Sequence, residues 1–183
     1  MAADFELTDD DLRVVVRYAT GWAEEVLPVF ERVRPDDARP RAAIEAARQF
    51  TGGARRSALQ RTAAFAAHRA AKTAPSEAAR LAAQAAGDAA AAAYLHPIAK
   101  AHQVGHILRA PANWAYIAEL ESGGDPAVGN AMTETVCKRT PPELVEVLSR
   151  YPQPSGGASR VAVLMADLDN RLRGTSPRFE WDA

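Results

Sequence analysis

A run of alanines in the middle of the chain constrains the fold more than any other feature. Ten of the fifteen residues from Ala79 to Ala93 are alanine, and alanine has the highest intrinsic helix propensity of all residues. A helix with such small side chains lets neighbouring helices approach closely on several sides. We therefore predict that residues 79–93 form a central helix in an all-α, multi-helix bundle.

Capping residues and apolar periodicity divide the rest of the chain into further helices. Thr8 followed by three aspartates is typical of a helix start, because the hydroxyl caps free N–H groups and the carboxylates face the positive end of the helix dipole. Pro28 and Pro111 are expected to kink or break their helices, and Ser76 is a candidate cap for the alanine-rich helix. The other expected helices span residues 8–30, 40–51, 55–72, 97–121, 127–139, 142–150 and 160–173.

The length and the cysteine content indicate the class of protein. A chain of 183 residues is expected to form a single domain, with a core over residues 8–173 and an irregular tail over residues 174–183. A single cysteine, Cys137, excludes an intrachain disulfide and fits a reducing cytoplasm. The acidic start is not a signal peptide, and no apolar run is long enough to span a membrane. We expect a cytoplasmic protein.

The overall charge is balanced. The chain has 22 Lys and Arg residues against 23 Asp and Glu residues, so no global field favours an anionic partner. No basic stripe with interleaved aromatic residues stands out either. We therefore expect neither nucleic acid nor a membrane as a partner. The excess of alanine, and of arginine over lysine, is typical of a GC-rich genome, which we interpret as actinobacterial.

The segment from Tyr94 to Tyr116 is the best candidate for a functional site. It holds three of the four histidines, His96, His102 and His106, together with Trp114, while His68 lies on a separate predicted helix. Histidine acts near neutral pH as acid, base or metal ligand. The concentration of this residue type in one segment points to chemistry or binding.

The spacing within this segment predicts one polar stripe on the fifth helix. His102, His106, Arg109 and Asn113 are separated by four, three and four residues, which places them on one face. The opposite face is the predicted core side and carries Val104, Ile107, Leu108, Pro111, Ala115 and Ala118. On this interpretation the histidines need not be buried.

Three interpretations of the histidines remain open: a structural polar network, a site for a ligand or partner, and a metal site. The candidate ligand-binding residues are His68, Asp88, Tyr94, His96, His102, His106, Arg109, Asn113 and Trp114, and the candidate catalytic residues are His102, His106 and Asp88. A buried Asp88 would need a histidine or arginine partner, whereas a solvent-facing one would not.

A metal site has the weakest support. His102 and His106 are one helical turn apart, which suits zinc. However, no sequence rule supplies a third ligand, and the HExxH signature is absent because Gln103 follows His102. We expect no metal or other cofactor.

Two segments resemble a known family. The run RPDDARPRAAIEAA from Arg34 and the run HPIAKAHQVGHI from His96 are similar to bacterial immunity proteins, the predicted immunity families of polymorphic toxin systems. Some relatives are labelled exonuclease-like. The resemblance extends from about Asp9 to Leu172. It implies an α-helical protein that binds and neutralises a toxin, and it provides no catalytic residues.

Two functional hypotheses follow. The first is a non-enzymatic immunity or self-protection protein that binds a protein toxin or a small toxic metabolite. The alternative is a small helical enzyme of secondary metabolism, in which His102 or His106 acts as an acid–base group or metal ligand beside Trp114 and Tyr116. An apolar patch left over after packing would be a candidate homodimer face.

Overall fold

The chain folds into helices throughout its described length. The computed structural model describes residues 5–174, which contain eight α-helices, two 3₁₀ turns and no β-strand. This confirms the predicted all-α, multi-helix fold, while residues 175–183 of the predicted tail lie outside the described part. The elements are α1 (Asp9–Glu31), α2 (Arg39–Thr51), α3 (Ala58–Lys72), α4 (Glu77–Ala91), η1 (Ala92–Tyr94), η2 (Ala101–Val104), α5 (Gly105–Glu121), α6 (Pro126–Arg139), α7 (Pro142–Ser149) and α8 (Arg160–Leu172).

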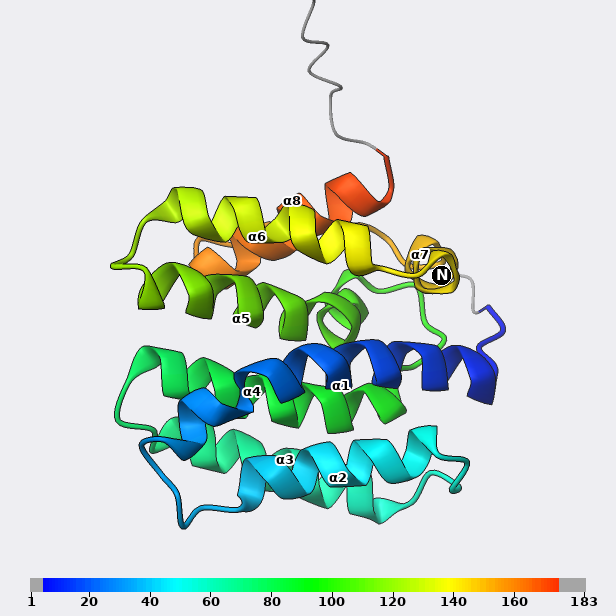
Figure 1. Cartoon of the computed structure of the whole chain (residues 1–183). Helices are drawn as coiled ribbons and strands as arrows, with labels where there is room; N and C mark the ends of the chain where they lie inside the picture. The colour runs from blue at the N-terminus through cyan, green and yellow to red at the C-terminus, as the bar shows by residue number, and fades with distance from the viewer. Residues whose placement is uncertain (1–4, 175–183) are drawn as a thin grey trace, which may run out of the picture.

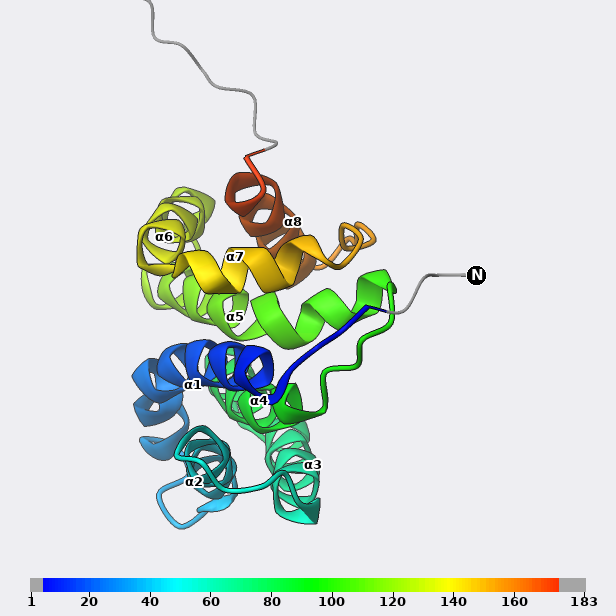
Figure 2. The ribbon, with the colours of Figure 1, turned by 90° about the vertical axis from the view of Figure 1, so that its right-hand side faces the viewer.

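The helices stack in layers (Figures 1 and 2). Helices α2 and α3 form one outer layer, α1 and α4 lie next to them, and α5 follows. Helices α6 and α8 cover the far side of α5, and α7 lies across the end of the bundle near the start of α1. Helix α4 contacts α1, α2, α3 and α5. The alanine-rich helix is therefore central, as its composition predicted.

Small side chains explain how α4 accommodates neighbours on so many sides. Seven alanines of this helix have no exposed surface: Ala79, Ala82, Ala83, Ala85, Ala86, Ala89 and Ala90. Because their side chains end at Cβ, the adjacent backbones approach without leaving cavities. Larger side chains such as Phe30, Phe50 and Leu81 fill the remaining core and are fully buried.

The helix starts follow local capping chemistry. The Thr8 hydroxyl accepts a hydrogen bond from the Asp11 N–H at 3.1 Å, and the Asp11 carboxylate accepts one from the Thr8 N–H at 2.9 Å. Ser76 caps α4 as expected. Helix α3 starts at Ala58, later than predicted, because Ser57 and Gln60 form a second capping box.

The fifth helix is present, but the prediction that it starts near residue 97 was wrong. The backbone of His96 is held by side chains instead: its N–H donates to Gln103 Oε1 at 2.9 Å, and its carbonyl accepts from the Tyr151 hydroxyl at 2.9 Å. The chain therefore runs irregularly to η2, and α5 begins only at Gly105.

The two prolines inside helices do not end them. Pro28 lies within α1 and Pro111 within α5, and both helices continue past them. Proline lacks the N–H that an uninterrupted helix would use. Both helices are packed against several neighbours, and this packing outweighs the loss. Within residues 5–174, no helix is both long and apolar enough to cross a bilayer.

Candidate functional site

A buried carboxylate lies at the centre of the site. Asp88 on α4 is only 2% exposed, and its burial raises the pKa of the carboxyl group. Arg109 Nη1 donates to Asp88 Oδ1 at 3.2 Å, and His68 Nε2 lies 3.6 Å from the same oxygen. The second oxygen, Oδ2, is buried without a hydrogen-bond partner among the described residues. An arginine and a histidine are thus the partners that a buried Asp88 was expected to need.

Two glycines let these partners approach. A Cβ atom on Gly87 would lie 2.8 Å from Cε1 of His68, so the ring rests directly on the backbone of α4. A Cβ atom on Gly105 would likewise overlap Nη2 of Arg109. Close backbone approach of this kind requires glycine. The positions of both partner groups therefore depend on residues that have no side chain.

The four histidines of the chain come together around this centre. Burial lowers the pKa of His106 on α5 to about 4, and the positive charges of Arg109 and of the other three histidines lower it further. His106 is therefore neutral near pH 7, and its Nδ1 atom is buried without a partner among the described residues. His102 and His96 lie on η2 and on the segment before it, and both are exposed.

The hydrogen bonds of Gln103 fix the tautomer of His102. Because Gln103 Oε1 accepts from the backbone N–H of His96, its amide nitrogen must face His102 Nε2, at 2.8 Å. An amide nitrogen only donates, so Nε2 is the acceptor and neutral His102 carries its proton on Nδ1. His102 thus presents a free N–H donor at the surface.

Two hollows meet at Arg109. One, of about 360 Å³, lies between α4, α5 and α8 and is lined by Glu77, Arg80, Gln84, Arg109, Tyr116, Ser159, Arg160 and Val161. The other, of about 220 Å³, is lined by Ala101, His102, Gly105, Arg109, Pro154, Ser155 and Met165. Only Nη1 of Arg109 has a hydrogen-bond partner in the described structure, on Asp88. The remaining N–H groups of this guanidinium are available to a ligand in either hollow.

The predicted polar stripe runs from the surface into the interior. Asn113 is fully buried, and its amide nitrogen donates to the Leu81 carbonyl of α4 at 3.4 Å. Arg109 also turns toward α4, while the predicted core side of α5, including Ile107 and Leu108, is buried as well. Helix α5 has neighbours on several sides, so Asn113 meets a helix rather than water, while Arg109 is partly exposed and His102 lies at the surface.

Besides Asn113, two further candidate residues lie apart from the Asp88 centre. Trp114 packs on Trp22 of α1, with ring centroids 4.8 Å apart, whereas Arg109 on the same helix pairs with Asp88 of α4. Tyr94 ends η1, and its hydroxyl donates to the Ser57 carbonyl at 2.6 Å, next to the start of α3. The structure thus brings His68, Asp88, His106 and Arg109 together, with His96 and His102 at the edge, and leaves Asn113, Trp114 and Tyr94 outside.

The described residues offer little to a metal ion. Over residues 5–174, no three His, Cys, Asp or Glu side chains are grouped so that they could hold one. His102 and His106, the candidate pair, lie on η2 and α5 rather than on one continuous helix. The contacts described above are hydrogen bonds and ion pairs.

Comparison with known proteins identifies the family. The family described as "Imm-5 like putative immunity protein" matches residues 6–139. The chain belongs to this family. No curated protein and no solved structure matches the chain. The sequence resemblance to immunity proteins is therefore confirmed.

The part of the chain that matches the immunity family contains the whole Asp88 centre. It covers α1 to α6 and thus includes His68, Asp88, His96, His102, His106 and Arg109. Helices α7 and α8 lie beyond it, so Ser159 and Arg160, which close one side of the larger hollow, come from outside the matched region. The larger hollow is thus lined by α4 and α5 from inside the matched region and by the start of α8 from outside it.

One feature of this family member was missed because the net charge concealed it. From residue 46 to residue 118 the sequence has nine Lys and Arg residues and only two acidic ones, Glu77 and Asp88. All four histidines fall in the same stretch. The remainder of the chain is correspondingly acidic. A count of charge along the sequence, rather than over the whole chain, would have revealed this separation.

Proposed function

We propose that this immunity-family protein protects its producer by binding a toxin inside the cell and blocking it. Membership of the immunity family over residues 6–139 carries the proposal. The Asp88 centre lies inside that region and is the part of the molecule best equipped to bind polar groups. We propose that the toxin contacts this centre through Arg109 and the neighbouring histidines.

Unused hydrogen-bonding groups support a binding role. Asp88 Oδ2 and His106 Nδ1 are buried without partners in the described structure, and Arg109 has spare donors beside two hollows. Burying a polar group without a hydrogen bond costs about 1–3 kcal/mol. The partly exposed guanidinium of Arg109 is the group that a toxin can reach directly, and acceptors on the toxin would pair with its spare donors.

The same geometry gives less support to the enzyme alternative. The 3.6 Å separation of His68 and Asp88 is too long for a hydrogen bond, so the carboxylate does not orient the imidazole as in a catalytic pair. The pKa of His106, about 4, lies far from neutral, and acid–base catalysis works best when the pKa is near the working pH. Both observations favour recognition over proton transfer.

A growth-protection assay tests the proposal. A candidate toxin encoded by a neighbouring gene is expressed in a sensitive host, with or without the protein, and complex formation is measured with the purified pair. Arg109→Lys keeps a positive charge next to Asp88 but removes the forked guanidinium. Arg173→Lys is the matched control, because Arg173 also pairs with a buried carboxylate, Asp169, at 2.8 Å.

We expect the wild type and Arg173→Lys to restore growth and to bind the toxin, and Arg109→Lys to do both poorly. Failure of the wild type to protect or to form a complex would contradict the proposed function. Equal protection by both variants would show that the toxin does not contact the Asp88 centre.

A further inference from the structure

Helix α3 presents positive charges that have no counter-ions. Arg55 and Arg56 precede the helix, and Arg61, Arg69 and Lys72 follow along its exposed side. Within residues 5–174, none of these five side chains forms an ion pair. No Asp or Glu occurs between residues 46 and 76 to provide one locally. We call this surface, together with Leu59, Phe65 and Tyr94, the α3 face.

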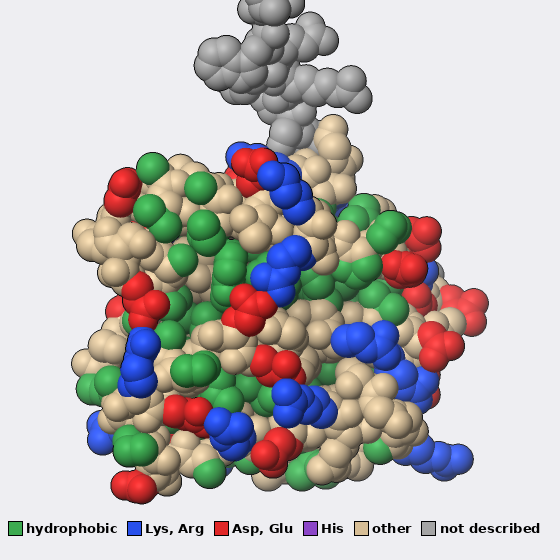
Figure 3. Space-filling view, viewed as in Figure 1, with side chains coloured by type: hydrophobic (Ala, Val, Ile, Leu, Met, Phe, Trp, Pro, Cys, Tyr) green, Lys and Arg blue, Asp and Glu red, His purple; other side chains and the backbone are tan. Residues whose placement is uncertain are grey.

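The opposite side of the molecule is organised differently. On the face shown in Figure 3, basic and acidic side chains lie next to one another. Helix α1 is joined to α2 and α6 by ion pairs: Arg48 with Glu24, Arg41 with Glu31, and Arg139 with Glu25. Such pairs neutralise the local potential. The α3 face therefore has the less compensated charge of the two surfaces.

The basic groups near the start of α3 are held in place. The guanidinium carbons of Arg56 and Arg61 lie 5.3 Å and 4.5 Å from the centroid of the Tyr94 ring. Arg56 also donates to the Ala93 carbonyl at 3.1 Å. Groups that are already ordered lose less entropy when they bind. The geometry thus favours binding of an anionic surface at this end of the helix.

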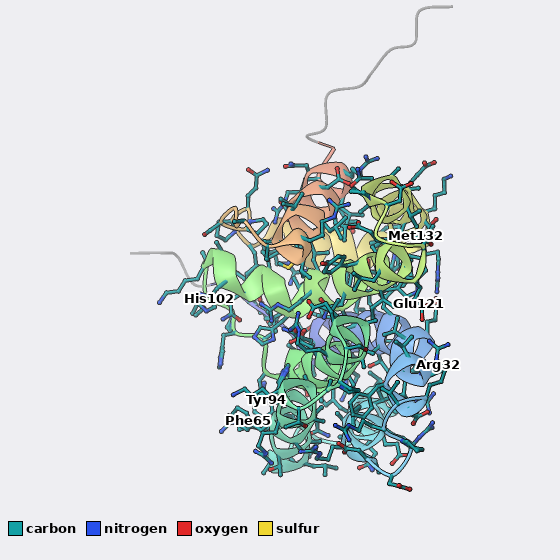
Figure 4. The ribbon with its side chains drawn as sticks, turned by 90° about the vertical axis from the view of Figure 1, so that its left-hand side faces the viewer. Arg32, Phe65, Tyr94, His102, Glu121 and Met132 are labelled. Carbon is teal, nitrogen blue, oxygen red and sulfur yellow. The ribbon has the colours of Figure 1, made fainter. Side chains whose placement is uncertain are left out.

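Apolar side chains lie among these charges. Phe65 is 58% exposed and Leu59 is 45% exposed, which are high values for such residues. Figure 4 shows Phe65, Tyr94 and His102 on the same side of the molecule, away from Arg32 and Glu121. His68, also on α3, links this surface to Asp88. The α3 face and the Asp88 centre are therefore adjacent.

We propose that the α3 face docks onto an acidic surface of a protein partner, with Phe65 as an apolar anchor. The proposal rests on the proposed function and specifies the partner's chemistry: carboxylate side chains around an apolar spot. Membership of the immunity family favours a protein partner over a nucleic acid, and the exposed Leu59 points the same way, because an aliphatic side chain has no ring on which a base could stack. Complementary charge of this kind mainly accelerates association and makes it sensitive to salt.

A pair of double variants tests this inference. Arg55→Glu/Arg69→Glu reverses two charges on the α3 face. Arg17→Glu/Lys138→Glu reverses two exposed charges on α1 and α6 and changes the net charge equally. Arg69 and Lys138 both lie in the last turn of a helix, so each double variant includes one unfavourable change against the helix dipole. Circular dichroism and thermal unfolding are used to check that both double variants fold.

Association rates are measured with the toxin that the growth-protection assay identifies, at low and at physiological salt. A labelled peptide of 20 glutamates and a single-stranded 20-nucleotide DNA serve as probes that need no toxin. For the α3-face variant, we expect the association rate with the toxin to be about tenfold lower at low salt. We also expect this variant no longer to bind the glutamate peptide. The control variant should stay within about twofold of the wild type.

Two results would overturn the inference. The first is that both double variants change the binding of toxin and of peptide equally. The second is that the wild type binds the DNA more tightly than the peptide while the α3-face variant binds the toxin as the wild type does. The second would assign the α3 face to nucleic acid. If the wild type forms no complex with the toxin, the proposed function fails, and the peptide measurement still decides whether the α3 face recognises acidic chains.

Discussion

Removing the guanidinium of Arg109 should destabilise the protein more than removing the charge of Asp88. Arg109→Met leaves a carboxylate that is 2% exposed with only His68 nearby. Asp88→Asn leaves a guanidinium whose side chain is 35% exposed and can be hydrated. Breaking a buried ion pair is costly mainly because the remaining charge is stranded. The two substitutions are therefore unequal, although they remove the same pair.

The size of the difference follows from the geometry. Unit charges 3.2 Å apart attract by about 5 kcal/mol at an effective dielectric constant of about 20. Solvent screening at the partly exposed Arg109 reduces this by about half. We expect Arg109→Met to lower the free energy of unfolding by about 2–3 kcal/mol, and Asp88→Asn to lower it by less than about 1 kcal/mol. In the double variant, most of the loss should be recovered.

The pH dependence provides an independent check. Burial raises the pKa of Asp88 and Arg109 opposes this rise, so the pKa should increase further in Arg109→Met. A carboxyl group with a raised pKa in the folded state stabilises the fold fully below its unfolded pKa, about 3.9, and this contribution is lost as the pH rises through the folded value. The deficit of Arg109→Met should therefore be largest near pH 7 and should narrow toward pH 4.5.

Urea unfolding followed by circular dichroism at 222 nm measures these free energies for the wild type, both single variants and the double variant. The reasoning would be refuted if Asp88→Asn cost as much as Arg109→Met. It would also be refuted if the deficit of Arg109→Met were the same at pH 7 and pH 4.5.

Three further predictions concern the same region. Gly87→Ala should push the His68 ring away from Asp88 and weaken toxin binding. The free energy of unfolding should stay within about 1 kcal/mol of the wild-type value, because alanine raises the helix propensity and the ring can swing outward. NMR of the His68 ring checks the displacement, and urea unfolding checks the stability. One histidine Cε1 resonance should titrate with a pKa of about 4, and His106→Leu should remove it. Since this pKa is lowered, His106 should stabilise the fold above about pH 6.5 and lose that contribution as the pH falls toward 4, so the variant should be less sensitive to acid over this range. Phe65→Ser should leave the melting temperature nearly unchanged, because the ring is 58% exposed, but should weaken the toxin complex.

Much of the fold could be predicted because its signals are local. Thr8, Ser57 and Ser76 cap helices through bonds to residues within three positions along the chain, and such bonds depend on few long-range contacts. The irregular start of α5 could not be predicted, because it depends on Tyr151, which is 55 residues from His96. Long-range hydrogen bonds leave no periodic trace in the sequence.

The candidate site was predicted only in part, for a related reason. Helical spacing placed His106, Arg109 and Asn113 on one face, but it could not show whether that face meets water or another helix. Asp88 stood out correctly as a polar residue among alanines. The α3 face was missed because opposite charges elsewhere in the chain cancel it in the total. Net charge measures the sum, whereas recognition depends on where the charges lie.

The alanine-lined contacts of α4 have a consequence for how such a protein can diversify. Positions that already have no room for a larger side chain can hardly vary, so α4 behaves as an invariant frame beneath the surface. The outward residues of α3, such as Arg69 and Phe65, are exposed and support little of the core. Under the proposed function, exchanging side chains on this one helix would therefore change toxin specificity while the underlying architecture is retained.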